Sequence, residues 1–364
     1  MFNFVDISIA FMIALVSSFL LTYPVKRFAV WVGAVDFPNY RKIHKEVTPR
    51  LGGIAIFLGA LLGGLYLFPK HDHMPEIFFG ALVILITGAM DDRFDIKPVV
   101  KMSGQLIAAS FLVSSGLIIE RITIPFIGMI DLGFFSVLIT VLWVVGITNA
   151  INLIDGLDGL ATGITTIALI SIFIMAVIDG QLIAAYLSIV LIGSNLGFLY
   201  HNFYPAKIYM GDTGSNFLGY MVAAISMLGL FINVAFFSFI VPIIVLAIPI
   251  FDTIVSIVRR AYNKENIMAA DNKHIHYQLL NAGYSHRKTV LIMYVFGAVF
   301  GGLAILFSTV GAKYSVVVTI FVLFFLHIFS ELAGIVLGGK RPIIDRLRKI
   351  KWKFYKKRDS RDRT

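Results

Sequence analysis

NAINLIDGLDGLATG, residues 149–163, lies between two strongly hydrophobic runs of the chain and yet carries two amides and two carboxylates. Asn149, Asn152, Asp155 and Asp158 follow one another at intervals of three residues, and side chains at that spacing are neighbours on a helical turn. Three glycines lie among them, and glycine lets the backbone come close to a ligand. The stretch therefore predicts a polar, acidic junction where a membrane helix meets water.

The composition of the whole chain indicates an integral membrane protein. Of its 364 residues, 58% are hydrophobic and only 14% are charged, whereas a soluble domain carries about 25% charged residues. Cysteine is absent, which excludes disulfides, thiolate metal sites and cysteine nucleophiles. The first apolar run begins at Ile7 without a basic segment or cleavage pattern, so we expect a retained helix rather than a signal peptide.

Eleven apolar runs are long enough to cross a hydrocarbon core of about 30 Å as helices. They span residues 7–22, 53–68, 77–90, 102–118, 134–150, 160–178, 182–199, 214–232, 236–258, 289–308 and 315–338. The predicted fold is therefore all-α, a polytopic bundle of about 11 transmembrane helices. We expect one transmembrane catalytic domain over residues 1–338 and a basic tail over residues 339–364, where apolar residues at helical spacing predict an amphipathic helix on the membrane surface.

The basic residues predict the orientation of the bundle. All of the 31 Lys and Arg residues except Lys70, Arg121 and Lys313 fall in the tail or in one of the two alternating sets of connecting segments. Positive charge favours the cytoplasmic side, so we expect the amino terminus outside and the tail in the cytoplasm. This topology explains the sequence pI of 9.6 without nucleic-acid binding. It also places five polar clusters at the cytoplasmic helix ends, at residues 41–50, 91–101, 149–158, 201–215 and 271–277.

Two of these clusters contain carboxylates whose role can be interpreted in two ways. Asp91 and Asp92 are adjacent, and such pairs persist where a cation compensates them or where one takes up a proton; a solvated helix end beside Arg93 and Lys97 is the alternative. Asp212 lies in a glycine-rich turn before an apolar run. It is either a plain helix cap or part of a phosphate-binding turn with a carboxylate available for Mg²⁺.

Two further features also leave alternatives open. Asp252 follows Pro249 inside the ninth run, and an acid within a membrane is costly and often functional, although a packing role beside a kink is equally open. His274 and His276 are two residues apart, which is not the spacing of two zinc ligands on one helix face. They suit an anionic ligand, or they are incidental histidines of a polar loop. Together, the clusters match the groups used in phosphoryl transfer.

The motifs also resemble those of a known superfamily. The stretch 149–163, the MDD pair, MGDTGSNFLG and HIHY are similar to signatures of the polyprenyl-phosphate N-acetylhexosamine-1-phosphate transferases, which include the peptidoglycan translocase. The resemblance runs from about Arg41 to Tyr277. It implies an enzyme of the cytoplasmic membrane in which undecaprenyl phosphate attacks the sugar-bound phosphorus of a UDP-sugar and UMP leaves. That reaction starts the synthesis of lipid-linked envelope glycans.

The resemblance also implies roles for individual residues. Asp212 resembles the Mg²⁺ ligand, with Asn152 as a second ligand and Mn²⁺ as an alternative metal, and Asp91 and Asp92 resemble the pair beside the attacking phosphate. The turn 155–158 resembles the nucleoside site, Tyr209 a residue stacking on uracil, and the two histidines groups near the diphosphate or sugar. The expected substrate-binding residues are Lys45, Arg50, Asn149, Asn152, Asp155, Gly156, Leu157, Asp158, Asn202, Tyr209, His274 and His276.

The choice of sugar follows from the last motif. The sugar-transferring branch usually has His-x-His-His, whereas this chain has Tyr277 in the last position, and tyrosine carries no positive charge near neutral pH. His-Ile-His-Tyr favours a simple UDP-N-acetylhexosamine, with UDP-GlcNAc expected and a MurNAc-pentapeptide or another N-acetylated sugar as the alternative. Membrane lipids and a homodimer are further expected partners.

Two rival classes are disfavoured. CDP-alcohol phosphotransferases carry an Ala-Arg pair where this chain has Thr162 and Gly163. A secondary transporter is the non-enzyme alternative, but transporter sites lie near the bilayer midplane and often within inverted repeats. Here the polar clusters lie at one surface, and no such repeat is apparent.

Overall fold

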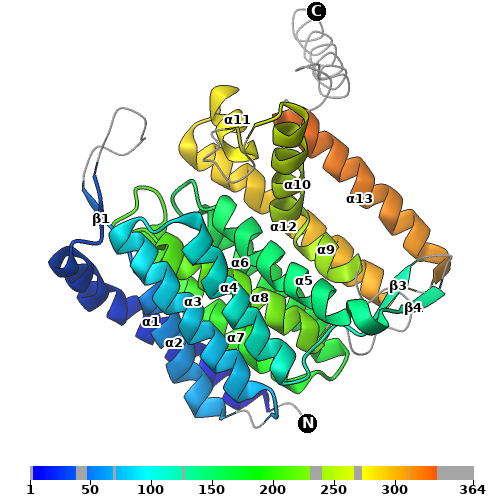
Figure 1. The fold of residues 1–364 in the computed structure, drawn as a ribbon, viewed down its shortest axis with the longest axis horizontal. Coiled ribbons are helices and arrows are strands. Elements are labelled where there is room, and N and C mark those ends of the chain that lie inside the picture. Colours follow the sequence, from blue (N-terminus) through cyan, green and yellow to red (C-terminus); the bar gives the residue numbers. More distant parts are fainter. Residues whose placement is uncertain are drawn as a thin grey trace, which may run out of the picture.

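The structure, a computed structural model, describes residues 3–37, 47–68, 71–124, 128–229, 240–265, 273–310 and 312–333. Long helices dominate it (Figure 1). They are α1 Phe4–Val32, α2 Gly52–Leu67, α3 Met74–Phe94, α4 Pro98–Ser114, α5 Ser136–Leu153, α6 Leu160–Ile178, α7 Leu182–Asn202, α8 Gly211–Gly229, α9 Ile240–Val245, α10 Ala247–Tyr262, α11 Ile275–Asn281, α12 His286–Thr309 and α13 Ala312–Ala333, with a short 3₁₀ turn, η1, over Gly133–Phe135.

This architecture confirms the predicted all-α polytopic class. Among the described residues, seven helices are long and apolar enough to cross a membrane, and α2 and α4 are shorter apolar helices. Each predicted apolar run overlaps a helix, and the ninth overlaps two, α9 and α10, which meet at Leu246. Pro249 lies in the first turn of α10, where proline is tolerated because its missing N–H has no partner there. The count of eleven crossings stays a prediction.

Helix α8 forms the centre of the bundle. Every residue from 213 to 229 is buried, because α2, α3, α5, α6 and α7 all pack against it. A helix that is buried on all sides needs small or apolar residues all round, and its sequence, TGSNFLGYMVAAISMLG, supplies them. The amino-terminal end of α8 is thereby held among the ends of the surrounding helices.

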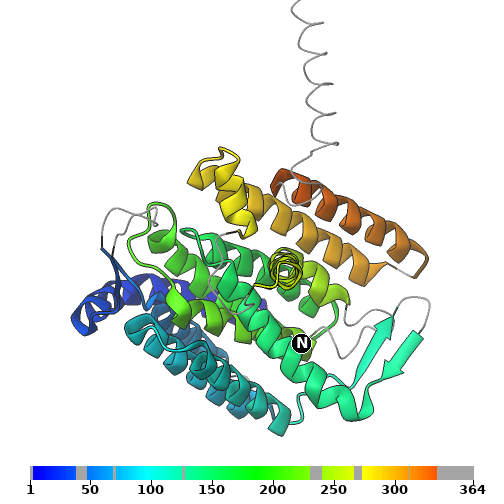
Figure 2. The same ribbon diagram turned by 45° about the horizontal axis from the view of Figure 1, so that its top comes forward.

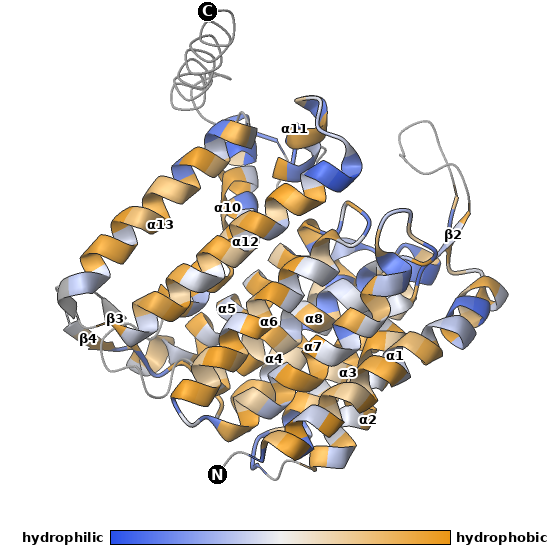
Figure 3. Cartoon of the chain, turned by 180° about the vertical axis from the view of Figure 1, so that it is seen from behind, coloured by the Kyte–Doolittle hydropathy of each residue, from blue (hydrophilic) through white to orange (hydrophobic). Residues whose placement is uncertain are grey.

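The carboxy-terminal helices form a second layer. Helix α12 packs on α6 and α9, and α13 packs on α12 (Figure 2). Helix α1 begins at one end of the bundle and α13 ends at the other (Figure 1). Hydropathy follows the same axis, since hydrophobic residues cover the helix lengths while hydrophilic residues gather around α11 and the nearby loops (Figure 3).

Two short antiparallel hairpins interrupt the helices, and the sequence did not predict them. Strands β1 (Val35–Asp36) and β2 (Thr48–Pro49) pair after α1. Strands β3 (Arg121–Ile124) and β4 (Gly128–Asp131) pair between α4 and α5, with Arg121 opposite Asp131. The first hairpin leads directly into Arg50, and the second lies at the end of the bundle away from α11 (Figure 1). The predicted tail, 339–364, lies outside the described residues.

Candidate active site

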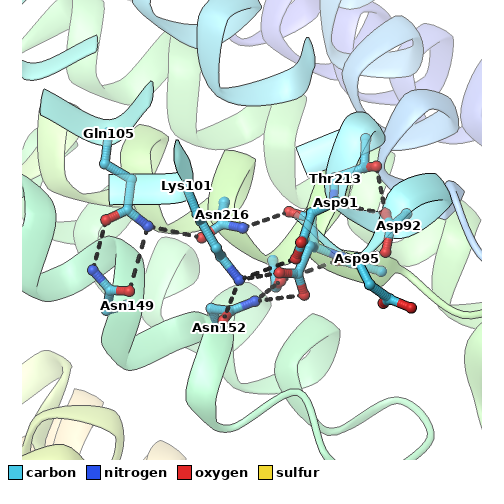
Figure 4. A network of polar contacts seen from close by, with 12 residues as sticks. Asp91, Asp92, Asp95, Lys101, Gln105, Asn149, Asn152, Thr213 and Asn216 are labelled. Carbon is cyan, nitrogen blue, oxygen red and sulfur yellow. Dashed lines mark hydrogen bonds and ion pairs between the residues drawn. The ribbon is translucent and has the colours of Figure 1, made fainter. Parts of the chain in front are cut away.

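Four helix ends meet in one polar network (Figure 4). Helix α3 contributes residues from its last turn, α4 from its first two turns, α5 from its last two turns and α8 from its first two turns. These helix ends come together because α3 and α5 both pack on α8, and α4 packs on both of them. The contributing residues are Asp91, Asp92, Lys101, Gln105, Asn149, Asn152, Asp212, Thr213, Ser215 and Asn216.

Lys101 lies at the centre of this network. Its Nζ forms an ion pair with Asp212 Oδ2, donates to Asn152 Oδ1 at 3.1 Å and lies 3.5 Å from Asp91 Oδ2. Asn152 in turn donates from Nδ2 to Asp212 Oδ1 at 3.0 Å and to Ser215 Oγ at 2.8 Å. The structure thus brings together Asp91, Asn152 and Asp212, three of the residues that the sequence pointed to, around one ammonium group.

Sequence reasoning missed the role of Lys101. The residue precedes the predicted span 102–118, where a lysine is accounted for by the excess of positive charge at cytoplasmic helix ends. Its distance from Asp212 in the chain, 111 residues, gave no sign of the pairing. One feature of the sequence could have indicated this role. Lys101 lies one helical turn after Pro98, at the start of α4, and α4 directly follows the acidic end of α3.

Asp91 and Asp92 have different surroundings. Asp92 is buried and accepts hydrogen bonds from the backbone N–H of Asp212 at 2.9 Å, from that of Thr213 at 2.9 Å and from Thr213 Oγ1 at 2.5 Å. It therefore caps the amino terminus of α8, where a carboxylate is favoured. Asp91 instead faces Lys101. One carboxylate of the pair fixes the geometry of α8, and the other faces the cation.

Gly211 makes this cap sterically feasible. Its φ of +70° lies in the left-handed region, and a Cβ built at this position would be 2.3 Å from Asp92 Oδ2. Both the conformation and the close approach require glycine. The glycine-rich turn before Asp212 thus serves Asp92 and the start of α8.

A second layer of amides supports the network from within the bundle. Asn149 Nδ2 donates to Gln105 Oε1 at 2.7 Å, Gln105 Nε2 donates to Asn216 Oδ1 at 3.2 Å, and Asn216 Nδ2 donates to the backbone oxygen of Asp212 at 2.8 Å. Asn149 is therefore linked to Asp212 through two other amides. A buried polar chain that is satisfied in this way fixes a unique arrangement.

The turn 154–159 lies beside this network. Asp158 Oδ2 accepts from the backbone N–H of Ala206 at 2.9 Å, and Leu157 is buried in the core. Burial, followed by the negative charges of Asp212 and Asp92, raises the pKa of Asp155 to about 8. The turn therefore carries an acidic group whose charge is opposed by the neighbouring carboxylates, and a cation or a proton relieves that repulsion.

Helix α11 covers this turn. A Cβ at Gly156 would lie 2.2 Å from His276 Nε2, so the glycine lets the two segments meet. His276 is fully buried, and burial lowers its pKa to about 4. Burial and the charge of Asp155 raise the pKa of Tyr277. The tyrosine that replaces the family's usual histidine therefore lies near Asp155.

The segment after α7 is held by internal hydrogen bonds. Asn202 accepts from Thr162 Oγ1 at 2.8 Å and donates to the backbone oxygen of Ile208 at 3.1 Å, so its amide shapes the loop within the protein. The backbone N–H of Tyr209 donates to the oxygen of Pro49 at 2.8 Å. Burial, followed by the charge of Asp158, raises the pKa of Tyr209 to about 12. These bonds place the Tyr209 region beside β2.

Of the two predicted basic residues, Arg50 is described, and Lys45 lies outside the described residues. Arg50 Nη2 lies 2.7 Å from Asp36 Oδ1, and its Nη1 lies 3.9 Å from Asp95. Burial lowers the pKa of Arg50, but the charges of Asp36, Asp92 and other carboxylates outweigh it and raise that pKa. Arg50 is thus held on the α3 side of the site.

The donor set around Lys101 is compatible with magnesium. Oxygens from Asp212, Asn152 and Asp91 converge on its ammonium nitrogen, which marks a place suited to a hard cation. Mg²⁺ typically uses one or two carboxylates and completes its shell with water and substrate phosphates. Among the described residues, no group of three or more His, Cys, Asp or Glu side chains is arranged to hold a metal.

Comparison with known proteins identifies the family. The model of glycosyl transferase family 4 matches residues 74–230, which include all four helix ends of the network. The chain is 42% identical, over 97% of its own length and 97% of the relative's, to a probable undecaprenyl-phosphate N-acetylglucosaminyl 1-phosphate transferase of Bacillus subtilis. It is 35% identical, over 80% of both chains, to a decaprenyl-phosphate N-acetylglucosaminephosphotransferase of Mycobacterium tuberculosis.

A third relative extends the comparison. An undecaprenyl-phosphate alpha-N-acetylglucosaminyl 1-phosphate transferase of Haemophilus influenzae is 32% identical over 87% of this chain and 92% of its own. The resemblance that the motifs indicated is therefore confirmed over nearly the whole length of the protein. The chain belongs to glycosyl transferase family 4.

Proposed function

We propose that this multi-pass membrane protein transfers GlcNAc-1-phosphate from UDP-GlcNAc to undecaprenyl phosphate and releases UMP. An oxygen of the lipid phosphate bonds to the sugar-bound phosphorus, and the bond from that phosphorus to the oxygen of UMP breaks. The observation that carries this proposal is the convergence of Asp91, Asn152 and Asp212 on Lys101, within the segment that the family model matches. The names of the relatives support the acceptor and the sugar.

In this proposal Asp212 and Asn152 would hold Mg²⁺, or Mn²⁺ in its place, which would supply positive charge against the diphosphate. Lys101 would supply a second positive charge for the phosphate oxygens, displaced from the place beside Asp212 that its ammonium holds in the structure. Asp91 orients the incoming lipid phosphate, which is already largely ionised at neutral pH. Asp92 acts through position only, by fixing the start of α8.

The nucleotide then lies on the side of the turn 155–158. Arg50, directly after β2, and Tyr209, in the segment after α7, border this side. Helix α11 borders it where His276 meets Gly156. Asn202 contributes by shaping the loop that carries Tyr209. This arrangement leaves the metal side and the nucleotide side adjacent, as a diphosphate that joins uridine to a sugar requires.

We further propose eleven crossings in the cytoplasmic, inner membrane, with the amino terminus outside and the site facing the cytoplasm. The distribution of Lys and Arg supports this topology. So does the position of the start of α1 at the end of the bundle opposite to the end of α13 (Figure 1). Because the chain has no cysteine, single cysteines can be introduced without background. Lys273→Cys should label only from the cytoplasm and Asp131→Cys only from outside, and the reverse pattern would overturn the orientation.

The activity test uses purified protein with Mg²⁺, undecaprenyl phosphate and UDP-GlcNAc, and it measures UMP. Release of UMP is expected from the wild type and from Asp131→Asn, a control on the distant β4. It should be abolished in Asp212→Asn, with thermal unfolding unchanged. A panel of UDP-sugars in the same assay tests the sugar. If no UDP-N-acetylhexosamine yields UMP while substrate moves across liposomes, the protein is a transporter instead. The proposed homodimer is tested by the mass of the protein in nanodiscs.

A further inference from the structure

The segment that carries the two histidines is held by a carboxylate from another helix. Asp252 belongs to α10, and its Oδ1 accepts from the backbone N–H of Ile275 at 3.0 Å, while its Oδ2 lies 3.1 Å from His274 Nδ1. Asp252 is 2% exposed and His274 is 4% exposed. A buried carboxylate is costly unless it is paired and hydrogen-bonded, and here both oxygens are used by two consecutive residues of one segment.

This contact fixes the orientation of the His274 ring. With Nδ1 directed at Asp252, Nε2 is the ring nitrogen turned away from the carboxylate. Arg259, on the same helix as Asp252, donates from Nη1 to the backbone oxygen of Lys273 at 3.0 Å. The backbone is therefore held on both sides of His274, and α10 determines where the imidazole points.

His274 and His276 differ in their surroundings. Their rings are nearly parallel, with centroids 5.9 Å apart. His276 is fully buried against Gly156, and neither of its ring nitrogens makes a hydrogen bond to the part of the chain that the structure describes. It therefore acts as a neutral contact between α11 and the turn 154–159. His274 instead has a carboxylate partner on α10. Of the two, His274 is therefore the one whose ring is oriented by another helix beside that turn.

We propose that Asp252 is a positioning residue for the nucleotide diphosphate, which it serves by holding His274 with Nε2 toward the ligand. The inference rests on the proposed function, because a uridine diphosphate must occupy the site. It assigns a role to the acid in the ninth apolar run, for which the sequence left function and packing equally open. It also predicts that the Asp252–His274 pair acts on the phosphates and leaves the uridine unaffected.

The test compares the affinities of uridine, UMP and UDP, measured by calorimetry on the full-length protein in detergent. The variants are Asp252→Asn, His274→Gln and the double variant. Glu331→Gln is the matched control, because Glu331 is also a buried acid beside a histidine, His327, at 3.1 Å. Each variant is scored by the ratio of UDP affinity to uridine affinity, which a general loss of structure does not change selectively.

We expect Asp252→Asn to lower this ratio about 10- to 100-fold, the size of effect seen when the carboxylate partner of a metal-binding histidine is lost, and to leave uridine affinity unchanged. The double variant should lose no more than His274→Gln, because the carboxylate acts through the imidazole. Glu331→Gln should keep the wild-type ratio. An unchanged ratio in Asp252→Asn, or an equal loss of uridine and UDP affinity, would overturn the inference.

The inference can still be tested if the Asp252→Asn variant does not fold. If Asp252→Asn fails to fold, His274→Gln decides, and a wild-type ratio in that variant overturns the inference. If the folded wild-type protein binds neither uridine, UMP nor UDP, the proposed function is wrong, and the inference is wrong as well. Wild-type binding of UDP with an unaffected His274→Gln variant instead rejects only the positioning role.

Discussion

The two halves of the candidate site are built in different ways. Around Asp212, side chains from four helix ends bind one another directly, and a lysine lies at their centre (Figure 4). Around the turn 154–159, the contacts are made by loops and a short helix, and His276 is buried without a hydrogen bond. The first half is thus set by the packing of long helices and the second by the fit between connecting segments. We expect changes in the first half to alter turnover and changes in the second to alter nucleotide affinity.

Among the variants that compare the two halves, the largest effect is expected for Lys101→Met. Removing the ammonium takes away the charge nearest to Asp212, so kcat should fall by about 10²- to 10³-fold, as for other lost electrostatic contacts. Uridine affinity should stay unchanged. Lys97→Met is the control, because Lys97 precedes α4 and is absent from the network. Steady-state release of UMP measures kcat. An equal loss of kcat in both variants would contradict a specific role of Lys101 in the helix-end half.

Gly211→Ala tests whether the helix-end half depends on the close contact with Asp92. The added Cβ meets the carboxylate at 2.3 Å in a left-handed conformation, so we expect the free energy of unfolding to fall by about 2–3 kcal/mol. Gly116→Ala shares the positive φ but meets nothing within 4 Å, and should cost about 1 kcal/mol. Thermal unfolding compares the two. Equal losses would show that strain alone matters and that the Asp92 contact contributes nothing.

Gly156→Ala tests the loop-built half. Its Cβ would lie 2.2 Å from His276 Nε2, so α11 must move away from the turn, and nucleotide affinity should fall about tenfold, equivalent to about 1.4 kcal/mol. Gly146→Ala, with open space around it, should bind as the wild type does. Calorimetry with UDP measures both. An unchanged UDP affinity in Gly156→Ala together with an altered kcat would contradict the expectation that the loop-built half determines nucleotide affinity.

The last prediction concerns pH. Burial lowers the pKa of His276 to about 4, below its ordinary 6.5, so between these values the unfolded chain binds more protons than the folded one. Stability from this group is full above pH 6.5 and is lost as the pH falls toward 4. The melting temperature of the wild type should therefore drop more than that of His276→Gln between pH 7 and about pH 5. Parallel pH profiles would show that His276 is not buried in neutral form.

The sequence predicted the helix-end half better than the loop-built half. Polar residues that interrupt apolar runs are conspicuous, so Asp91, Asn152 and Asp212 could be placed near one another from topology alone. The different roles of Asp91 and Asp92 could not be predicted, because adjacent residues on a helix point about 100° apart and only the packing of α8 decides which one is buried. Lys101 was missed because its charge already had a topological explanation.

The loop-built half depends on contacts between distant segments with no periodic pattern. Asp252 and His274 are 22 residues apart, and nothing in either motif indicates the other. The contact between Gly156 and His276 likewise follows from how α11 lies on the turn. The two hairpins escaped prediction because strands of two to four residues are too short to show alternation.

The central position of α8 has a consequence for how the protein responds to its membrane. Lipids that are too long or too short for a protein act on the helices that they touch, and those helices adapt by tilting. Residues 213–229 are buried within the bundle, so the helix that carries Asp212 is shielded from such forces by its neighbours. The geometry around Asp212 should therefore tolerate bilayers of different thickness, and adaptation to the host membrane can occur in the outer helices without rearrangement of the polar network.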